Sequence, residues 1–527
     1  AASERPADPE KKLNEIKQDE GLGTAMWGSW CKQFFVADRE YAGPQEEPEV
    51  KQKFELLDLS KVALKTDFSD IADKGYLRDS LKWIESARLN AYGRFGSLWR
   101  SYRRNPANPA SRYVARYGRT WIYDNALAIY AELKTAALAQ MSGCPNTGAA
   151  HTQNAKKAAD ALVNLSRLEE QNGFKGLWRF SYNTIDDNFV DPRGPLGANL
   201  WALNAIYAYI LQTGDERNLG WLKDSVKSFL FKQQVMDEND PRFGLIRGGL
   251  YNASDYKKGE NMGYSVDEGD PNIQNEYCFI EHNADFIGTL RLAAIAEKRF
   301  NGGRDEKFLS DLRQRHELCV KAILKNFWLG DHFCTAMEPD GTINTSVAVD
   351  NNSWVADIIM PYDAERAWQS IRYNRKKFMV MMRLGDKVID GLSFFAGDFK
   401  DPYLMNMSDA DRKLMEEMVQ PEATFGYVLL LMRYAEHTPN KERKAECLML
   451  INRLYRSMVL LKEHFGGLGT PYATVDIPGY FNTMESMAGT ATGVVVTTAM
   501  LGVDADDFIG ISPPEDFTVD GRRPFSD

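Results

Sequence analysis

The sequence predicts an all-α fold, an (α/α)6 barrel in which six outer and six inner helices form a closed toroid of six hairpins. Apolar residues recur at three- and four-residue spacing, the period of an amphipathic helix, in twelve segments from residue 76 onward. The segments alternate between charged helices, which bury one face, and apolar helices rich in small residues, which are buried on most sides. The spacing by itself would also fit an open solenoid or an irregular helical array.

The outer helices are the charged segments, in which one apolar stripe faces the barrel and the other side faces water. They are expected at residues 76–95, 152–170, 217–234, 305–327, 364–382 and 440–462. The inner helices are the apolar segments, expected at residues 121–140, 197–213, 282–299, 350–360, 411–436 and 485–501.

The openings of the inner helices recur at a regular interval. They are placed at Asp124, Asn199, Glu281, Asp350, Glu422 and Glu485, which are 75, 82, 69, 72 and 63 residues apart. A unit of this length that buries its apolar face only against its neighbours is typical of a repeat architecture. Six hairpins with regular alternation favour closure of the repeats into a ring.

Three regions follow from this pattern. Residues 1–75 form an N-terminal arm, residues 76–510 the barrel and residues 511–527 a C-terminal tail. The arm contains an aromatic cluster, MWGSWCKQFF, which we expect to anchor it on the barrel through Trp27, Trp30, Phe34 and Phe35. Short glycine- and aromatic-rich loops with brief strand-like alternation precede the inner helices. We expect these loops to build one mouth of the barrel.

Composition excludes several classes of partner. The net charge of −10 and the pI near 5.4 argue against nucleic acid and against an anionic membrane surface, because both need a basic face. No apolar stretch approaches the roughly 20 residues of a membrane span. The polar start of the chain is typical of a mature exported protein, so we expect a periplasmic or secreted location with the signal peptide removed.

No metal or cofactor is expected. The six cysteines are scattered and contain no CxxC pair. The zinc motif HExxH, the phosphate-binding GK[ST] loop and the dinucleotide fingerprint GxGxxG are absent as well. Any chemistry therefore has to come from ordinary side chains.

Carboxylates mark the openings of five of the six inner helices. Each one could simply cap its helix, since acids are favoured at the positive N-terminal end. Together they would converge in one partly desolvated pocket, where mutual repulsion raises some of their pKa values. One protonated and one ionised carboxyl are what cleavage of a glycosidic bond requires. The candidate catalytic residues are Glu281, Asp124, Glu485, Asp350 and Glu422.

Glu281 is the expected general acid, because it lies four residues before Asp285 on one helical face, with His282 beside it. Asp124 is the expected base or water-positioning group. In a ring of six, helices one and four face each other, as do helices three and six. Acids that face each other across the barrel suit the wide carboxyl separation of an inverting enzyme, about 6.5–9.5 Å.

Aromatic side chains near the same openings could stack on sugar rings, although each could equally belong to the core. His282 could orient a substrate hydroxyl, titrate with Glu281 or donate to a backbone carbonyl. The predicted substrate-binding residues are Trp121, Tyr123, Asn125, Trp178, Asn199, Trp201, His282, Asp285, Trp354 and Tyr427.

Five segments carry a family resemblance: TWIYDNAL, GANLWALNAIYAYILQTGDERNL, EHNADF, VAVDNNSWVA and the final GTPYAT followed by MESMAGTATG. Over roughly residues 76–505 the chain resembles the six-hairpin glycosidase superfamily of carbohydrate-active (α/α)6 enzymes. The resemblance implies a carbohydrate substrate. Most members are inverting hydrolases with a Glu or Asp acid and a second carboxylate as base, and others are lyases, phosphorylases or epimerases.

The favoured hypothesis is an exported glycoside hydrolase that cleaves a polysaccharide or oligosaccharide without a cofactor. One alternative is a polysaccharide lyase that uses His282 and a tyrosine, which the acidic openings disfavour because a uronate substrate needs a basic cleft. The other is a non-catalytic carbohydrate-binding or envelope-assembly protein. In that case the aromatic arm would dock an envelope or secretion complex.

Overall fold

The computed structural model describes residues 67–89, 95–103, 119–184, 189–191, 193–250, 272–395, 407–477 and 481–526. The aromatic anchors predicted for the arm, Trp27, Trp30, Phe34 and Phe35, lie outside the described residues.

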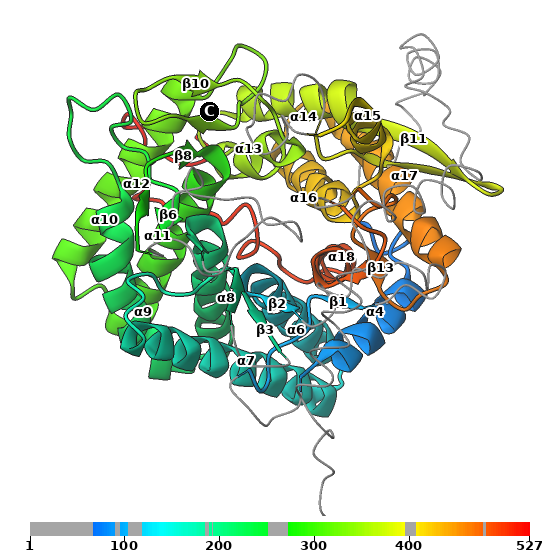
Figure 1. The fold of residues 1–527 in the computed structure, drawn as a ribbon, viewed down its shortest axis with the longest axis horizontal. Helices are drawn as coiled ribbons and strands as arrows, with labels where there is room; N and C mark the ends of the chain where they lie inside the picture. Colours follow the sequence, from blue (N-terminus) through cyan, green and yellow to red (C-terminus); the bar gives the residue numbers. More distant parts are fainter. Residues whose placement is uncertain are drawn as a thin grey trace, which may run out of the picture.

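The inner helices form a closed ring, as Figure 1 shows. Each contacts the next one along the chain, and the last one, α18, contacts the first one, α6. The (α/α)6 barrel predicted from the sequence is therefore confirmed, and an open solenoid is excluded. The inner helices are α6 (Ile122–Met141), α8 (Leu196–Thr213), α11 (Ile280–Asn301), the 3-10 turn η4 (Val349–Asn352) with α13 (Trp354–Ile359), α16 (Pro421–His437) and α18 (Met487–Met500).

The outer helices surround this ring. They are α4 (Lys74–Ala87), α7 (Pro145–Gln171), the run α9 (Leu219–Ser225), η2 (Val226–Leu230) and α10 (Phe231–Gln233), then α12 (Glu306–Asn326), α14 (Ala364–Phe378) and α17 (Lys441–Phe465). The two layers differ in burial as predicted. In α16 every residue from Pro421 to Ala435 is buried, whereas α12 buries only a stripe that includes Leu312 and Val320.

One predicted inner helix is two helices in the structure. The segment 411–436 is divided into α15 (Asp409–Glu417) and α16, which begins at Pro421. Proline lacks the backbone N–H of a helix interior and suits the first turn, so it starts a new helix here.

Short antiparallel strands join the loops at the N-terminal ends of the inner helices. A strand leads directly into each of α6, α8, α11 and α18. The three-stranded sheets are β2 (Arg119–Trp121), β3 (Ser181–Asn183) and β4 (Phe189–Asp191); β5 (Gly194–Pro195), β6 (Gly249–Leu250) and β7 (Gln274–Asn275); β10 (Ile343–Asn344), β9 (Ala336–Met337) and β8 (Cys278–Phe279); and β1 (Tyr102–Arg103), β14 (Glu485–Ser486) and β13 (Thr470–Pro471). A separate hairpin, β11 (Met379–Leu384) with β12 (Lys387–Leu392), packs on α17.

A side chain in the first turn of every inner helix binds the backbone of a preceding loop. In each case the fourth residue of the helix accepts a hydrogen bond from a loop N–H at 2.8–3.0 Å. We call this interaction a clasp. The six clasps join Asn125 to Trp99, Asn199 to Trp178, Asn283 to Ile246, Asn352 to Phe333, Thr424 to Leu392 and Thr490 to Thr470.

The clasps satisfy backbone groups that burial would otherwise leave unpaired. All six accepting side chains are buried. Asn125, Asn199 and Asn283 also donate to the carbonyl four residues earlier, so each amide bonds both the loop and its own helix start. The clasps thus tie the mouth loops to the inner ring.

The C-terminal segment packs against the inner helices. Phe508, Ile511 and Phe517 are buried in the main core. The buried Arg291 of α11 donates to the carbonyl of Ile511 at 2.7 Å. Tyr362 donates to the carbonyl of Phe517 at 2.6 Å. The chain beyond α18 is therefore packed against the barrel up to Val519.

Thr490→Val should destabilise the protein by about 1–3 kcal/mol, because it leaves the buried N–H of Thr470 without its acceptor. Thr492→Val is the matched control on the same helix, since the buried Thr492 hydroxyl has no hydrogen-bond partner in the part of the chain that the structure describes. We expect that change to be neutral or stabilising. Urea unfolding of both variants measures the difference, and equal effects would contradict the importance of the clasp.

Candidate active site

Three carboxylates share one position in the repeat. Glu281, Asp350 and Glu422 are each the second residue of their inner helix, on α11, η4 and α16, which follow one another around the ring. Tyr123 holds the same position on α6. The three acids interact electrostatically, because the charge of Glu422 raises the pKa of Glu281 and both glutamates raise the pKa of Asp350. We call these three residues the acid cluster.

Glu422 has two hydrogen-bond donors. The hydroxyl of Tyr123 donates to Glu422 Oε1, and Gln420 Nε2 lies 3.4 Å from Oε2. Burial raises the pKa of Glu422 to about 7, although both donors favour the ionised form and oppose the shift. These donors make Glu422 the best stabilised anion of the cluster.

Glu281 is more accessible than the other two acids, since its side chain is half-buried. Burial, and then the charge of Glu422, raises its pKa to about 7. The Asn351 amide nitrogen lies 2.9 Å from Glu281 Oε1 when the amide oxygen accepts from Thr335 and the Ala348 N–H. The charge of Glu422 thus favours a proton on Glu281, and the hydrogen bond donated by Asn351 opposes it.

Asp350 is buried and its Oδ1 has no hydrogen-bond partner among the described residues. Burial raises its pKa well above the ordinary value, and the charges of Glu281, Glu422 and Asp285 add to this shift. These effects favour the protonated form of Asp350, which can donate a hydrogen bond.

His282 and Asp285 extend the cluster on α11. Burial lowers the pKa of His282 to about 4, so its imidazole is neutral at pH 7. Its Nδ1 has no hydrogen-bond partner among the described residues. The ring lies against Gly197 of α8, where an added Cβ would come within 2.5 Å of His282 Cδ2. Burial and Glu281 raise the pKa of Asp285 well above its usual range, and a hydrogen bond from Trp201 opposes the shift.

An aromatic layer lies one helical turn further along the inner helices. Trp201, Asp285 and Trp354 are each the sixth residue of their inner helix. The rings of Tyr123 and Trp201 are 5.4 Å apart, and those of Trp201 and Trp354 are 5.3 Å apart. The indole N–H of Trp354 has no partner among the described residues and lies where a Cβ on Gly426 would collide with it.

Glu485 lies in different surroundings. Its carboxylate accepts hydrogen bonds from Trp83 Nε1 at 2.6 Å and from the Gly469 N–H at 2.9 Å. Trp83 belongs to the outer helix α4, so Glu485 joins the two helix layers. Asp124 is buried one residue after Tyr123, at the third position of α6, which is not the position of the clustered acids.

Several predicted binding residues make structural contacts, and their role in binding stays a prediction. Asn125 and Asn199 form clasps. Trp178 is fully buried and donates to the carbonyl of Leu162, and Tyr427 donates to the carbonyl of Ile371, so both lie in the packing between helix layers. Trp121 is half-buried beside Tyr102, with their rings 5.4 Å apart.

Asn351 and Gln420 were missed from the sequence. A signal for them existed, because the clasp residue marks the same register in each repeat. Counting back from Asn352 and Thr424 places Asp350 and Glu422 at one position, with Asn351 directly after Asp350 and Gln420 two residues before Glu422.

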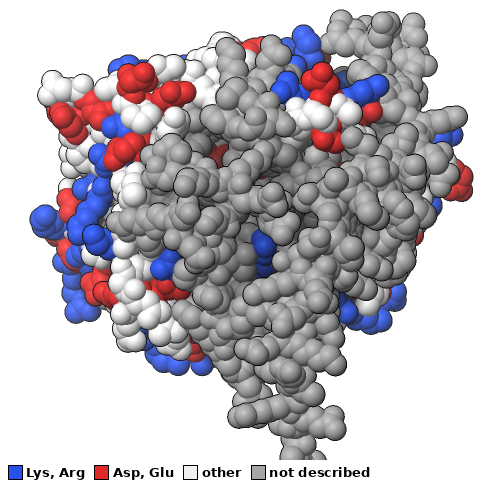
Figure 2. Space-filling view, viewed as in Figure 1, with Lys and Arg blue, Asp and Glu red and all other residues white. Residues whose placement is uncertain are grey.

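Metal and membrane features were also searched in the described part of the chain. No group of three or more His, Cys, Asp or Glu side chains there could hold a metal ion. None of its helices is both long and apolar enough to span a bilayer. Figure 2 shows acidic and basic side chains interspersed over the described part of the face seen in Figure 1.

Comparison with known proteins supports the fold. No known protein family and no curated protein matches the sequence. A D-mannose isomerase structure matches with a TM-score of 0.52 and 11% identity, over 81% of this chain and 96% of that one. A cellobiose 2-epimerase from Bacillus thermoamylovorans B4167 matches with a TM-score of 0.52 and 9% identity, over 81% of this chain and 98% of that one. These likenesses show that the chain has an (α/α)6 fold, as its sequence predicts.

The acid cluster should make stability depend on pH. Glu281 and Glu422 have pKa values of about 7 in the folded state against an ordinary 4.5, so the folded state binds more protons between these values. Stability should therefore fall as the pH rises from about 4.5 through 7 and then level off. Urea midpoints measured across this range should fall less in the double variant Glu281→Gln/Glu422→Gln. Equal slopes in both proteins would contradict the raised pKa values.

Proposed function

We propose that the protein is a glycoside hydrolase in which Glu281 is the general acid and Glu422 the general base. The observation that carries this proposal is the acid cluster itself, three buried or half-buried carboxyls on consecutive elements of the inner ring. Hydrolysis of a glycosidic bond needs one carboxyl that gives a proton and one that activates water. Two glutamates with pKa values of about 7 can share these roles near neutral pH.

The hydrogen bonds support this division of roles. Tyr123 and Gln420 donate to Glu422 and favour its ionised form, as a base requires. The charge of Glu422 in turn keeps the proton on Glu281. Asp124, the base expected from the sequence, is replaced by Glu422 in this proposal because Glu422 is the residue that interacts with Glu281.

Unpaired polar atoms beside the acids are suited to sugar hydroxyls. Asp350 Oδ1, His282 Nδ1 and Trp354 Nε1 have no hydrogen-bond partner among the described residues. Buried polar atoms are normally paired, so these three are expected to bind a polar ligand or water. The rings of Tyr123 and Trp201 add apolar surface of the kind that stacks on a sugar.

A second candidate function is the isomerisation or epimerisation of a free sugar. His282 favours it, because a neutral, half-buried imidazole can take a proton from the carbon next to a carbonyl. The two structural likenesses, to a mannose isomerase and to a cellobiose epimerase, agree with this chemistry.

The periplasmic or secreted location and the docking role of the arm stay predictions.

Glu281→Gln should lower the rate of glycoside hydrolysis about 10²–10⁴-fold, because the amide cannot supply the proton. New reducing ends released from a panel of neutral and acidic polysaccharides and oligosaccharides measure the rate. Glu463→Gln is the matched control, since Glu463 is an exposed acid on α17 that pairs with Lys387. Activity that survives Glu281→Gln would exclude Glu281 as the acid.

The two candidate functions differ in their products. A hydrolase creates reducing ends, whereas an epimerase or isomerase leaves their number unchanged and exchanges a sugar C–H with solvent deuterium. Suppose that the wild type exchanges deuterium without releasing new reducing ends, and that His282→Gln abolishes this exchange. The proposed function would then be isomerisation and not hydrolysis. An unsaturated product that absorbs ultraviolet light would indicate a lyase, and binding without any product would indicate a carbohydrate-binding protein.

A further inference from the structure

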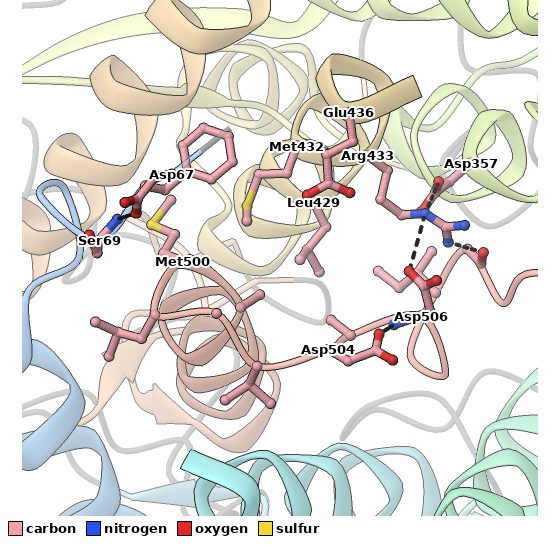
Figure 3. Close-up of a pocket in the computed structure, with 18 residues that line it drawn as sticks. Asp67, Ser69, Asp357, Leu429, Met432, Arg433, Glu436, Met500, Asp504 and Asp506 are labelled. Carbon is pink, nitrogen blue, oxygen red and sulfur yellow. Dashed lines mark hydrogen bonds and ion pairs between the residues drawn. The ribbon is translucent and has the colours of Figure 1, made fainter. Parts of the chain in front are cut away.

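A pocket lies at the other end of the inner helices, away from the acid cluster. Its volume is about 730 Å³, within the range of small-molecule sites. It is bounded by the last turns of α16 and α18, by residues 501–510 and by residues 67–69, and Figure 3 shows its lining side chains. The acids of the proposed active site are at the first turns of the same ring, so the two sites are separate.

The lining of this pocket is strongly acidic. Arg433 is its one basic side chain among the described residues. The C-terminal ends of α16 and α18 add the partial negative charge of the helix dipole. The acidic lining residues are Asp67, Asp357, Glu436, Asp504 and Asp506.

The buried carboxylate of Asp357 accepts no hydrogen bond from the described residues. Its side chain is 1% exposed, and neither carboxylate oxygen has a hydrogen-bond partner among them. Arg433 Nε is 3.5 Å from Asp357 Oδ1, too far and too poorly aligned to donate. The guanidinium donates instead to the carbonyl of Gly510 and, at 3.3 Å, to Ser512. Asp357 is therefore open to another donor from the pocket.

The pKa of Glu436 indicates a negative electrostatic potential in this part of the pocket. Burial raises its pKa, and the charge of Asp506 raises it further, with a larger effect than the opposing one of Arg433. A cation bound here would relieve this repulsion between carboxylates.

The other walls are apolar and match an organic molecule better than a metal ion. They include Phe68, Leu429, Met432, Met500 and Ile509. In the described part of the chain no three acidic side chains come together closely enough to hold a metal. Acidic ends joined by apolar walls fit a flexible chain of methylene groups that carries ammonium groups.

We propose that this pocket binds a linear aliphatic polyamine. One ammonium group hydrogen-bonds to Asp357 near Glu436, Asp504 and Asp506, since Asp357 and Asp506 both lie within 4.0 Å of Arg433 Nε. Another lies beside Asp67, which Figure 3 shows on the other side of the pocket. The methylene chain between them packs along Leu429 and Met432. This site is independent of the proposed hydrolase activity.

Calorimetric titration of the full chain with spermidine tests the proposal. We expect one binding site, weakened about tenfold or more by Glu436→Gln and by the pair Asp504→Asn/Asp506→Asn, because each removes charged hydrogen-bond acceptors. Glu463→Gln removes one acid from an outer helix and should leave the affinity unchanged. Diaminohexane should bind and hexanediol, of the same length without charge, should not.

Asp357→Asn is the most direct variant, but it leaves the buried Arg433 without its counter-charge and can unfold the protein. A melting curve therefore accompanies it, and the exposed-acid variants carry the test if it does not fold. No spermidine binding at millimolar concentration would overturn the proposal. Equal weakening by Glu463→Gln, equal binding of hexanediol, or binding of Ca²⁺ in competition with spermidine would overturn it as well.

Discussion

The clasp between the fourth residue of each inner helix and a loop N–H is the interaction on which the rest of the structure depends. Six such hydrogen bonds, all from buried side chains, set where each inner helix starts and which way its first turn faces. Because 3.6 residues make one turn, fixing one position fixes the direction of the others. The second residue of each helix, and one turn later the sixth, then have equivalent places around the ring.

The acid cluster results from this shared register. Glu281, Asp350 and Glu422 stand at the second position of successive inner-ring elements. Acids at helix N-termini are stabilised as anions by about 0.3–1 kcal/mol, less than one pKa unit. The pKa values of Glu281 and Glu422 nevertheless rise from 4.5 to about 7. Burial therefore outweighs the helix dipole, and at Glu281 the charge of Glu422 adds to the effect of burial. As a result, these carboxyls can exchange protons near neutral pH.

The carboxyl groups at the two ends of the ring are in different electrostatic surroundings. At the N-terminal end, burial raises the pKa values of the acids, and the Tyr123 and Gln420 donors favour ionisation of Glu422. At the C-terminal end, Asp357 stays beside Arg433, whose hydrogen bonds are directed to the C-terminal segment. That segment is thus both a structural part of the barrel and one wall of the pocket at that end.

The sequence by itself determined the helices and their two layers, because hydrophobic periodicity and alternation depend on burial along each helix. It favoured a closed ring, and the contacts between α18 and α6 decided it. It also placed Glu281, Asp350 and Glu422 at helix openings. Only the tertiary structure decided which acids are neighbours: Glu422 interacts with Glu281, while Glu485 is bound by Trp83 and Gly469. It also decided that Trp178 and Tyr427 pack between helix layers. The physical reason is that periodicity records whether a side chain is buried, whereas its partner depends on contacts between residues far apart in the chain.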